Sequence, residues 1–142
     1  MRHFQNERGA TMLEFALILP VLLTVMFGIM ESGRLMSTYV ALAGAARAGT
    51  RYAIVHGSDR TGTGADGPSG AGNTSNVVTV VKNITSAGGL SGSVSVDVEY
   101  PYGNAIGDPV TVTVSYPFNA VVLPLIPLTV TLGSTSQGTI CY

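Results

Sequence analysis

Charged residues are scarce in this chain: they make up 11% of its 142 residues, against about 25% in a typical soluble domain. The net charge is −1, so no basic surface points to nucleic acid as a partner. Tryptophan is absent, and the one cysteine, Cys141, cannot form an internal disulfide or a four-ligand metal site. We interpret Cys141 as an unpaired thiol, and a bridge to another chain stays open.

Groups that carry enzyme chemistry are equally few. Beyond residue 30 there is one histidine, His56, and no GxSxG motif or metal-ligand spacing accompanies it. The segment 62–67 matches the GxGxxG pattern, but Pro68 follows where a dinucleotide-binding loop would open a helix. Three acceptor residues in the same loop lack the spacing of an EF-hand: Asp59, Asp66 and Asn73. We therefore expect no enzyme activity, no metal and no cofactor.

Hydrophobic residues make up 46% of the chain, and they concentrate between Ala10 and Met30, where Glu14 is the one charged residue. About 20 helical residues cross the ~30 Å hydrocarbon layer of a membrane. Arg2 and Arg8 precede this run, so the positive-inside rule places the N-terminus in the cytoplasm. The chain from about residue 32 onward would then lie on the periplasmic side of a bacterial inner membrane.

Three interpretations compete for this segment. A secretory signal peptide has a shorter apolar run and a small-residue cleavage site, and the residues 31–34 supply none. A plain signal anchor fits the length but leaves Glu14 without a role, although an acid in hydrocarbon costs about 2.5–3.5 kcal/mol. A pilin-type leader explains both the apolar run and the carboxylate. The alternative for Glu14 is a side chain that reaches back to the headgroups, because it lies one turn inside the run.

The N-terminus resembles that of type IV pilins, in which a short basic leader ends in glycine and glutamate is the fifth mature residue. Here Gly9 would end the leader and Ala10 would begin the mature chain, so that Glu14 is the fifth mature residue and Phe15 the sixth. Cleavage would create an α-amine at Ala10. The resemblance implies that this amine pairs with Glu14 of a neighbouring subunit.

Three longer stretches resemble the TadE-like proteins of the tight-adherence pilus system: residues 8–20, 27–34 and 45–53. The resemblance implies a minor pilin or pseudopilin that a prepilin peptidase processes and that takes part in pilus biogenesis and cell adhesion. Its implied partners are the inner membrane, the peptidase and other pilin and assembly subunits, including copies of itself. An uncleaved, signal-anchored periplasmic adaptor or binding module is the alternative function.

The membrane helix is expected to continue beyond the membrane surface, because residues 31–55 contain no proline. Pro20 should kink it about four residues earlier, and Gly57 is a plausible end. Small residues that allow close helix packing gather in two overlapping motifs: Gly44, Ala45, Ala48 and Gly49. They can pack on this protein's own sheet or on neighbouring subunits, and the sequence leaves both open.

The remainder of the chain predicts a Gly-rich loop at 57–76, followed by a helix at 77–86 that Asn76 caps. The many β-branched residues of 77–86 favour a strand as the alternative. Apolar and polar residues alternate at 94–100, 110–116 and 128–132, which predicts three half-buried antiparallel strands.

The predicted fold is therefore α+β and pilin-like: a long membrane-spanning N-terminal helix that continues into a helix packed on a small antiparallel sheet. Its parts are a leader at 1–9, a membrane and assembly helix at 10–30, and a periplasmic domain at 31–142. The apolar, proline-broken segment 118–127 is interpreted as a loop that caps the core, with a contact to another subunit as the alternative.

Overall fold

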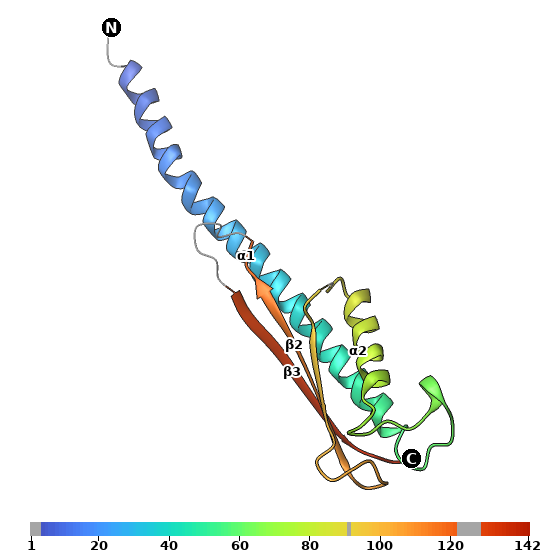
Figure 1. Cartoon of the computed structure of the whole chain (residues 1–142). Coiled ribbons are helices and arrows are strands. Elements are labelled where there is room, and N and C mark those ends of the chain that lie inside the picture. Colours follow the sequence, from blue (N-terminus) through green and yellow to red (C-terminus); the bar gives the residue numbers. More distant parts are fainter. Residues whose placement is uncertain (1–3, 91, 122–128) are drawn as a thin grey trace.

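The computed structural model describes residues 4–90, 92–121 and 129–142, with side chains from residue 9 onward. Its elements are α1 (Phe4–Ile54), a 3-10 turn (Gly64–Asp66), α2 (Ser75–Ala87), β1 (Ser95–Glu99), β2 (Pro109–Asn119) and β3 (Thr129–Thr139). The strands form one antiparallel sheet in the order β1-β2-β3, and α1 and α2 pack beside it (Figure 1). The predicted α+β architecture is confirmed.

Helix α1 is continuous from the leader to the domain, because nothing after Pro20 interrupts its backbone hydrogen bonds. It passes through Pro20 without a break, and a local kink there stays a prediction. The helix ends at Ile54 in a tightened turn, in which the amide of Val55 donates to the carbonyl of Tyr52. Gly57 follows, as expected, and a Cβ on it would lie 2.3 Å from the backbone oxygen of Tyr142. Only glycine therefore fits where the chain turns away.

The C-terminal half of α1 forms the centre of the core. Its buried residues recur at helical spacing and begin with Thr38, and Leu42 is the first apolar one. The same core holds the inward-facing residues of β2 and the apolar face of α2. The fully buried apolar residues of the described chain are Leu42, Ala45, Ala46, Ala53, Val77, Val81, Val110, Val112, Val114 and Ile140.

The structure separates the two small-residue motifs of α1 by face. Ala45 and Gly49 are buried, and a Cβ on Gly49 would lie 2.5 Å from Val81 Cγ2 of α2. Gly44 is exposed, with no atom within 4 Å of the position of a Cβ, and Ala48 is half-buried. The first pair therefore packs on this protein's own domain, whereas Gly44 faces outward.

The predicted strands at 94–100 and 110–116 are confirmed as β1 and β2, with β2 at the centre of the sheet. The third predicted strand is confirmed as β3, which begins at Thr129 and continues to Thr139, beyond the alternating residues 128–132 on which the prediction rested. The half of β3 beyond residue 132, which the alternation did not predict, carries small residues on its inner face instead of large apolar ones. A Cβ on Gly138 would lie 2.4 Å from Ile54 Cδ1, which shows how closely α1 crosses this strand.

The predicted helix at 77–86 is confirmed as α2, and its stripe of apolar residues faces α1. The predicted cap was wrong: α2 begins at Ser75 with Thr74 as the N-cap. The side chain of Asn76 instead donates to the carbonyl of Gly64 at 2.7 Å, because the Gly-rich loop folds back over the start of the helix. Gly89, at φ +80°, then lets the chain turn away from the end of α2.

The apolar segment 118–127 begins as strand and not as loop, since Phe118 and Asn119 belong to β2 and Phe118 is buried. Residues 122–128 lie outside the described residues, so its interpretation as a capping loop or a subunit contact stays a prediction. The ends of the segment are joined, because Thr129 Oγ1 donates to Asn119 Oδ1 at 2.9 Å.

The contrast between Gly49 and Gly44 predicts a difference in stability. Gly49→Val should lower the free energy of unfolding by about 1–3 kcal/mol, because its side chain overfills a packed site between α1, α2 and β2. Gly44→Val is the matched control and should leave stability unchanged or slightly higher. Urea unfolding of both full-length variants in detergent micelles measures this. Equal losses would contradict the assigned faces of α1.

Candidate membrane and assembly helix

The N-terminal half of α1 projects away from the domain (Figure 1). From Gly9 to Ser37 every residue is exposed except Glu31, which is half-buried. At 1.5 Å per residue, this stretch is about 43 Å long. Its large apolar side chains are exposed in the part of the chain that the structure describes, and Met12, for example, is 76% exposed. A continuous apolar surface of this size requires either lipid or other helices around it.

The helix meets the requirements for crossing a membrane. The candidate span lies within Gly9–Ile54, its most apolar window has a mean hydropathy of 2.3, and none of that window is buried in the domain. The run ends on the domain side at the ion pair of Glu31 and Arg34, with Arg34 Nη1 2.9 Å from Glu31 Oε1. A single-pass membrane anchor is compatible with this helix.

Two hydroxyl groups, one within the span and one just after it, bond to the helix itself. Thr24 Oγ1 donates to the carbonyl of Pro20 at 2.8 Å, and Ser32 Oγ donates to the carbonyl of Gly28 at 2.8 Å. In hydrocarbon an unsatisfied hydroxyl would be costly, so the first bond allows Thr24 to lie in lipid. Glu14 differs, because its carboxylate takes part in none of the ion pairs between described residues.

The predicted pairing residues lie together at the free end of α1. Ala10 and Glu14 are four residues apart, so they share one face of the helix, and Phe15 adjoins them. All three are exposed, as is Gly9. The Gly9–Ala10 bond itself lies inside α1, which begins at Phe4. The arrangement offers an isolated carboxylate, one turn from the proposed new N-terminus, to a partner outside this chain.

His56 and Cys141, the residues of the domain best able to carry chemistry, make contacts within the fold. The His56 ring is buried and stacks on Tyr52 with centroids 3.9 Å apart, and its Nδ1 lies 2.8 Å from the Tyr52 carbonyl oxygen. Cys141 is exposed, and its thiol donates to the carbonyl of Thr139 at 3.3 Å. Among the described residues, no group of three or more His, Cys, Asp or Glu side chains could hold a metal ion.

The Gly-rich loop is tied to the end of the domain far from the span. The hydroxyl of Tyr100 donates to Ser69 Oγ at 3.1 Å, and Ser69 Oγ donates to the carbonyl of His56. Burial raises the pKa of Tyr100 above its ordinary value, although the bond to Ser69 acts in the opposite direction. Burial likewise raises the pKa of Tyr52, with the charge of Asp66 contributing, and its hydroxyl donates to the carbonyl of Ala65.

The structure adds one group that the sequence analysis did not single out as a site. The Arg34 guanidinium lies over the ring of Phe118, with Cζ 5.3 Å from the ring centroid. These residues are far apart in the chain, and only the fold brings them together. The sequence offered one signal for this group: Glu31 and Arg34, an acid and a base three residues apart, directly follow the apolar run.

Comparison with known proteins identifies the same part of the chain. A family model described as TadE-like protein matches residues 9–51, which cover the membrane span and most of the buried half of α1. No curated protein and no solved structure gives a significant match. The segment 9–51, which begins at the predicted cleavage site and lies within α1, is therefore similar to TadE-like proteins, in agreement with the resemblance of the three motifs.

Proposed function

We propose that this chain is a minor pilin, or pseudopilin, of a tight-adherence pilus system. In this proposal a prepilin peptidase cuts it after Gly9, and it then enters a pilus or its assembly complex through the free half of α1. The observation that carries the proposal is the isolated Glu14 on an uncovered apolar helix within a TadE-like segment. Its role requires no catalytic group, and the covalent chemistry is done to this protein by another.

Assembly would bury the surface that the domain leaves uncovered. In the membrane, lipid covers the apolar side chains of residues 10–30, and in an assembled bundle neighbouring helices replace the lipid. Glu14 is costly in either setting unless a cation meets it. The α-amine that cleavage creates at Ala10 is a cation at the correct depth, and a neighbouring subunit can present it. The carboxylate thereby favours assembly over residence in lipid.

Cleavage would require the start of α1 to unwind, because proteases act on extended backbone and Gly9–Ala10 lies within the helix. Gly9 favours this, since glycine in a helix is about 1 kcal/mol less favourable than alanine. The bond is also only one to two turns from the beginning of α1, where helices fray. Gly9 would thus make the bond easier for the peptidase to reach and would place a small residue at the cleavage site.

Orientation provides the first prediction of this proposal. Arg2 and Arg8 should keep the N-terminus in the cytoplasm, so the domain should lie in the periplasm. Alkaline phosphatase fused after Tyr142 should be active, and β-galactosidase fused at the same position should be inactive. The reverse pattern would contradict the assigned topology.

Processing provides the second prediction. In cells with a prepilin peptidase, N-terminal sequencing should find Ala10 as the first residue, with Arg2, Glu7 and Arg8 lost in the leader. Gly9→Leu should abolish the cut, because a bulky residue strengthens the helix and crowds the scissile bond. Gly28→Leu, an exposed glycine farther along α1, is the control and should be processed normally. Met1 on assembled protein would favour the uncleaved adaptor.

Assembly provides the third prediction. Glu14→Ala should leave membrane insertion intact or improved, because it removes a charge from the apolar run. It should reduce incorporation into pilus complexes strongly, since stranding the partner charge of a buried pair costs about 3–5 kcal/mol. Copurification with pilus subunits, the mature N-terminus and membrane abundance are measured together.

Two variants sharpen that comparison. Glu14→Gln keeps the side-chain size and should fail like Glu14→Ala if charge is what matters. Met12→Ala, on the same exposed turn, tests the loss of apolar contact and should be incorporated far better. Normal incorporation of Glu14→Gln would mean that the carboxylate has no pairing role and only reaches to the headgroups.

A further inference from the structure

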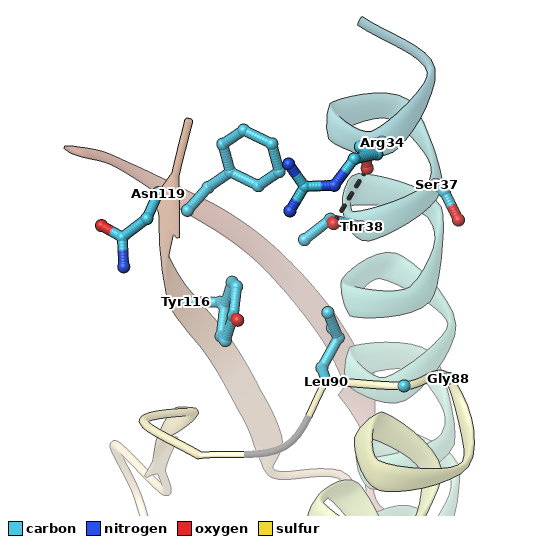
Figure 2. A pocket seen from close by; sticks show the side chains of 9 residues that line it. Arg34, Ser37, Thr38, Gly88, Leu90, Tyr116 and Asn119 are labelled. Carbon is cyan, nitrogen blue, oxygen red and sulfur yellow. Dashed lines mark hydrogen bonds between the residues drawn. The ribbon is translucent and has the colours of Figure 1, made fainter. Parts of the chain in front are cut away.

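A groove opens between α1 and β2 at the end of the domain that adjoins the membrane span. Its volume is about 260 Å³. Figure 2 shows Arg34 extending from α1 into it, with Tyr116 and Leu90 on the opposite and lower sides. Asn119 and Phe118 complete the side formed by β2. We call this the Arg34 groove.

The groove lies at the depth of the lipid headgroups. Arg34 follows the last apolar residue of the run, Met30, by four residues, which is about 6 Å along a helix. A bilayer is about 30 Å thick in hydrocarbon and about 40–45 Å with its headgroups, so each headgroup layer is about 5–8 Å deep. A helix that spans the hydrocarbon with residues 10–30 therefore places Arg34 within this layer.

The charges of the groove suit a phosphodiester. Arg34 is 46% exposed, and only its Nη1 is engaged by Glu31, at 2.9 and 3.0 Å from the two carboxylate oxygens. The guanidinium also lies over the ring of Phe118, with Cζ 5.3 Å from the ring centroid. The guanidinium is thus fixed in place while part of its donor fork faces outward, and such a fork matches the geometry of phosphate oxygens.

Apolar side chains flank the groove on the membrane side. Val121, which follows the end of β2, is 67% exposed, and Val130 of β3 is exposed beside Phe118, its partner in the sheet. Exposed valines beside an arginine are suited to the boundary between headgroups and acyl chains.

From the position of the groove along α1, its guanidinium and the apolar side chains beside it, we propose that the Arg34 groove binds a phospholipid headgroup of the periplasmic leaflet. The guanidinium would bind the phosphodiester of that lipid. The domain would then rest on the bilayer by this end while the chain awaits assembly, and extraction into a pilus would break the contact. The proposal requires the membrane anchor but not cleavage or the pairing of Glu14, so it stands or falls separately from the pilin function.

The test uses the full chain in phospholipid nanodiscs, with Cys141→Ser as the background. Val121→Cys carries a fluorophore, and a nitroxide on the lipid headgroups quenches it. Tyr102→Cys, 81% exposed in a loop far from the span along the chain, is the control position. We expect quenching at Val121 to exceed that at Tyr102 at least threefold. Equal quenching would overturn the proposal, because the domain would then stand clear of the bilayer.

Substitution of the guanidinium separates binding from simple tethering by α1. Arg34→Gln should reduce quenching at Val121 by half or more, and Arg34→Lys should restore part of it. The control is Arg47→Gln, which changes an exposed arginine in the domain half of α1 and should have no effect. Nanodiscs of a phosphate-free galactolipid should remove the difference between wild type and Arg34→Gln. If Arg34→Gln changes nothing, or if its effect persists in galactolipid, the phosphodiester is not the ligand and a protein partner is the better occupant.

Discussion

Helix α1 has to satisfy two environments with one unbroken backbone, and the rest of the structure depends on how it does so. Apart from its two ends and Pro20, which has no amide hydrogen to donate, its backbone hydrogen bonds are internal to the helix, as lipid requires of the first half. The domain gains a rigid core element without a hinge. The cost is an apolar surface about 43 Å long that the domain cannot cover, so lipid or neighbouring helices must.

The two halves of α1 differ in side-chain size as well as in hydrophobicity. The free half carries large apolar residues that fill space among lipid tails, with Glu14 as the one ionisable exception between Ala10 and Met30. The buried half carries Ala45 and Gly49, which bring the helix axis close to α2 and β2. Gly138 does the same from β3. Small residues therefore fix the domain onto the helix, and a carboxylate sets the helix apart from an ordinary anchor.

The sequence predicted those features that local periodicity encodes. The alternation of apolar and polar residues predicted β1 and β2, because burial of one face of a strand leaves a regular pattern. The continuous apolar run predicted the membrane span. The second half of β3 was not predicted, because its inward-facing residues are small and not apolar: Ser134, Ser136 and Gly138. At Gly138 helix α1 lies too close to admit a larger side chain. Asn76 was misassigned as a cap because its true partner, the carbonyl of Gly64, lies in a loop whose path no local pattern records. The contact of Arg34 with Phe118 needed the whole fold.

In the proposed function the free half of α1 contacts other pilus subunits, whereas Ala45, in the buried half, packs inside its own domain. Site-specific photo-crosslinking in piliated cells tests this directly, with the photoreactive residue at Phe15 or at Ala45. The account predicts crosslinks from Phe15 to other pilin subunits that disappear without the prepilin peptidase, and only intramolecular products from Ala45. Crosslinks from Phe15 to lipid alone, in cells whose pili are assembled, would contradict it.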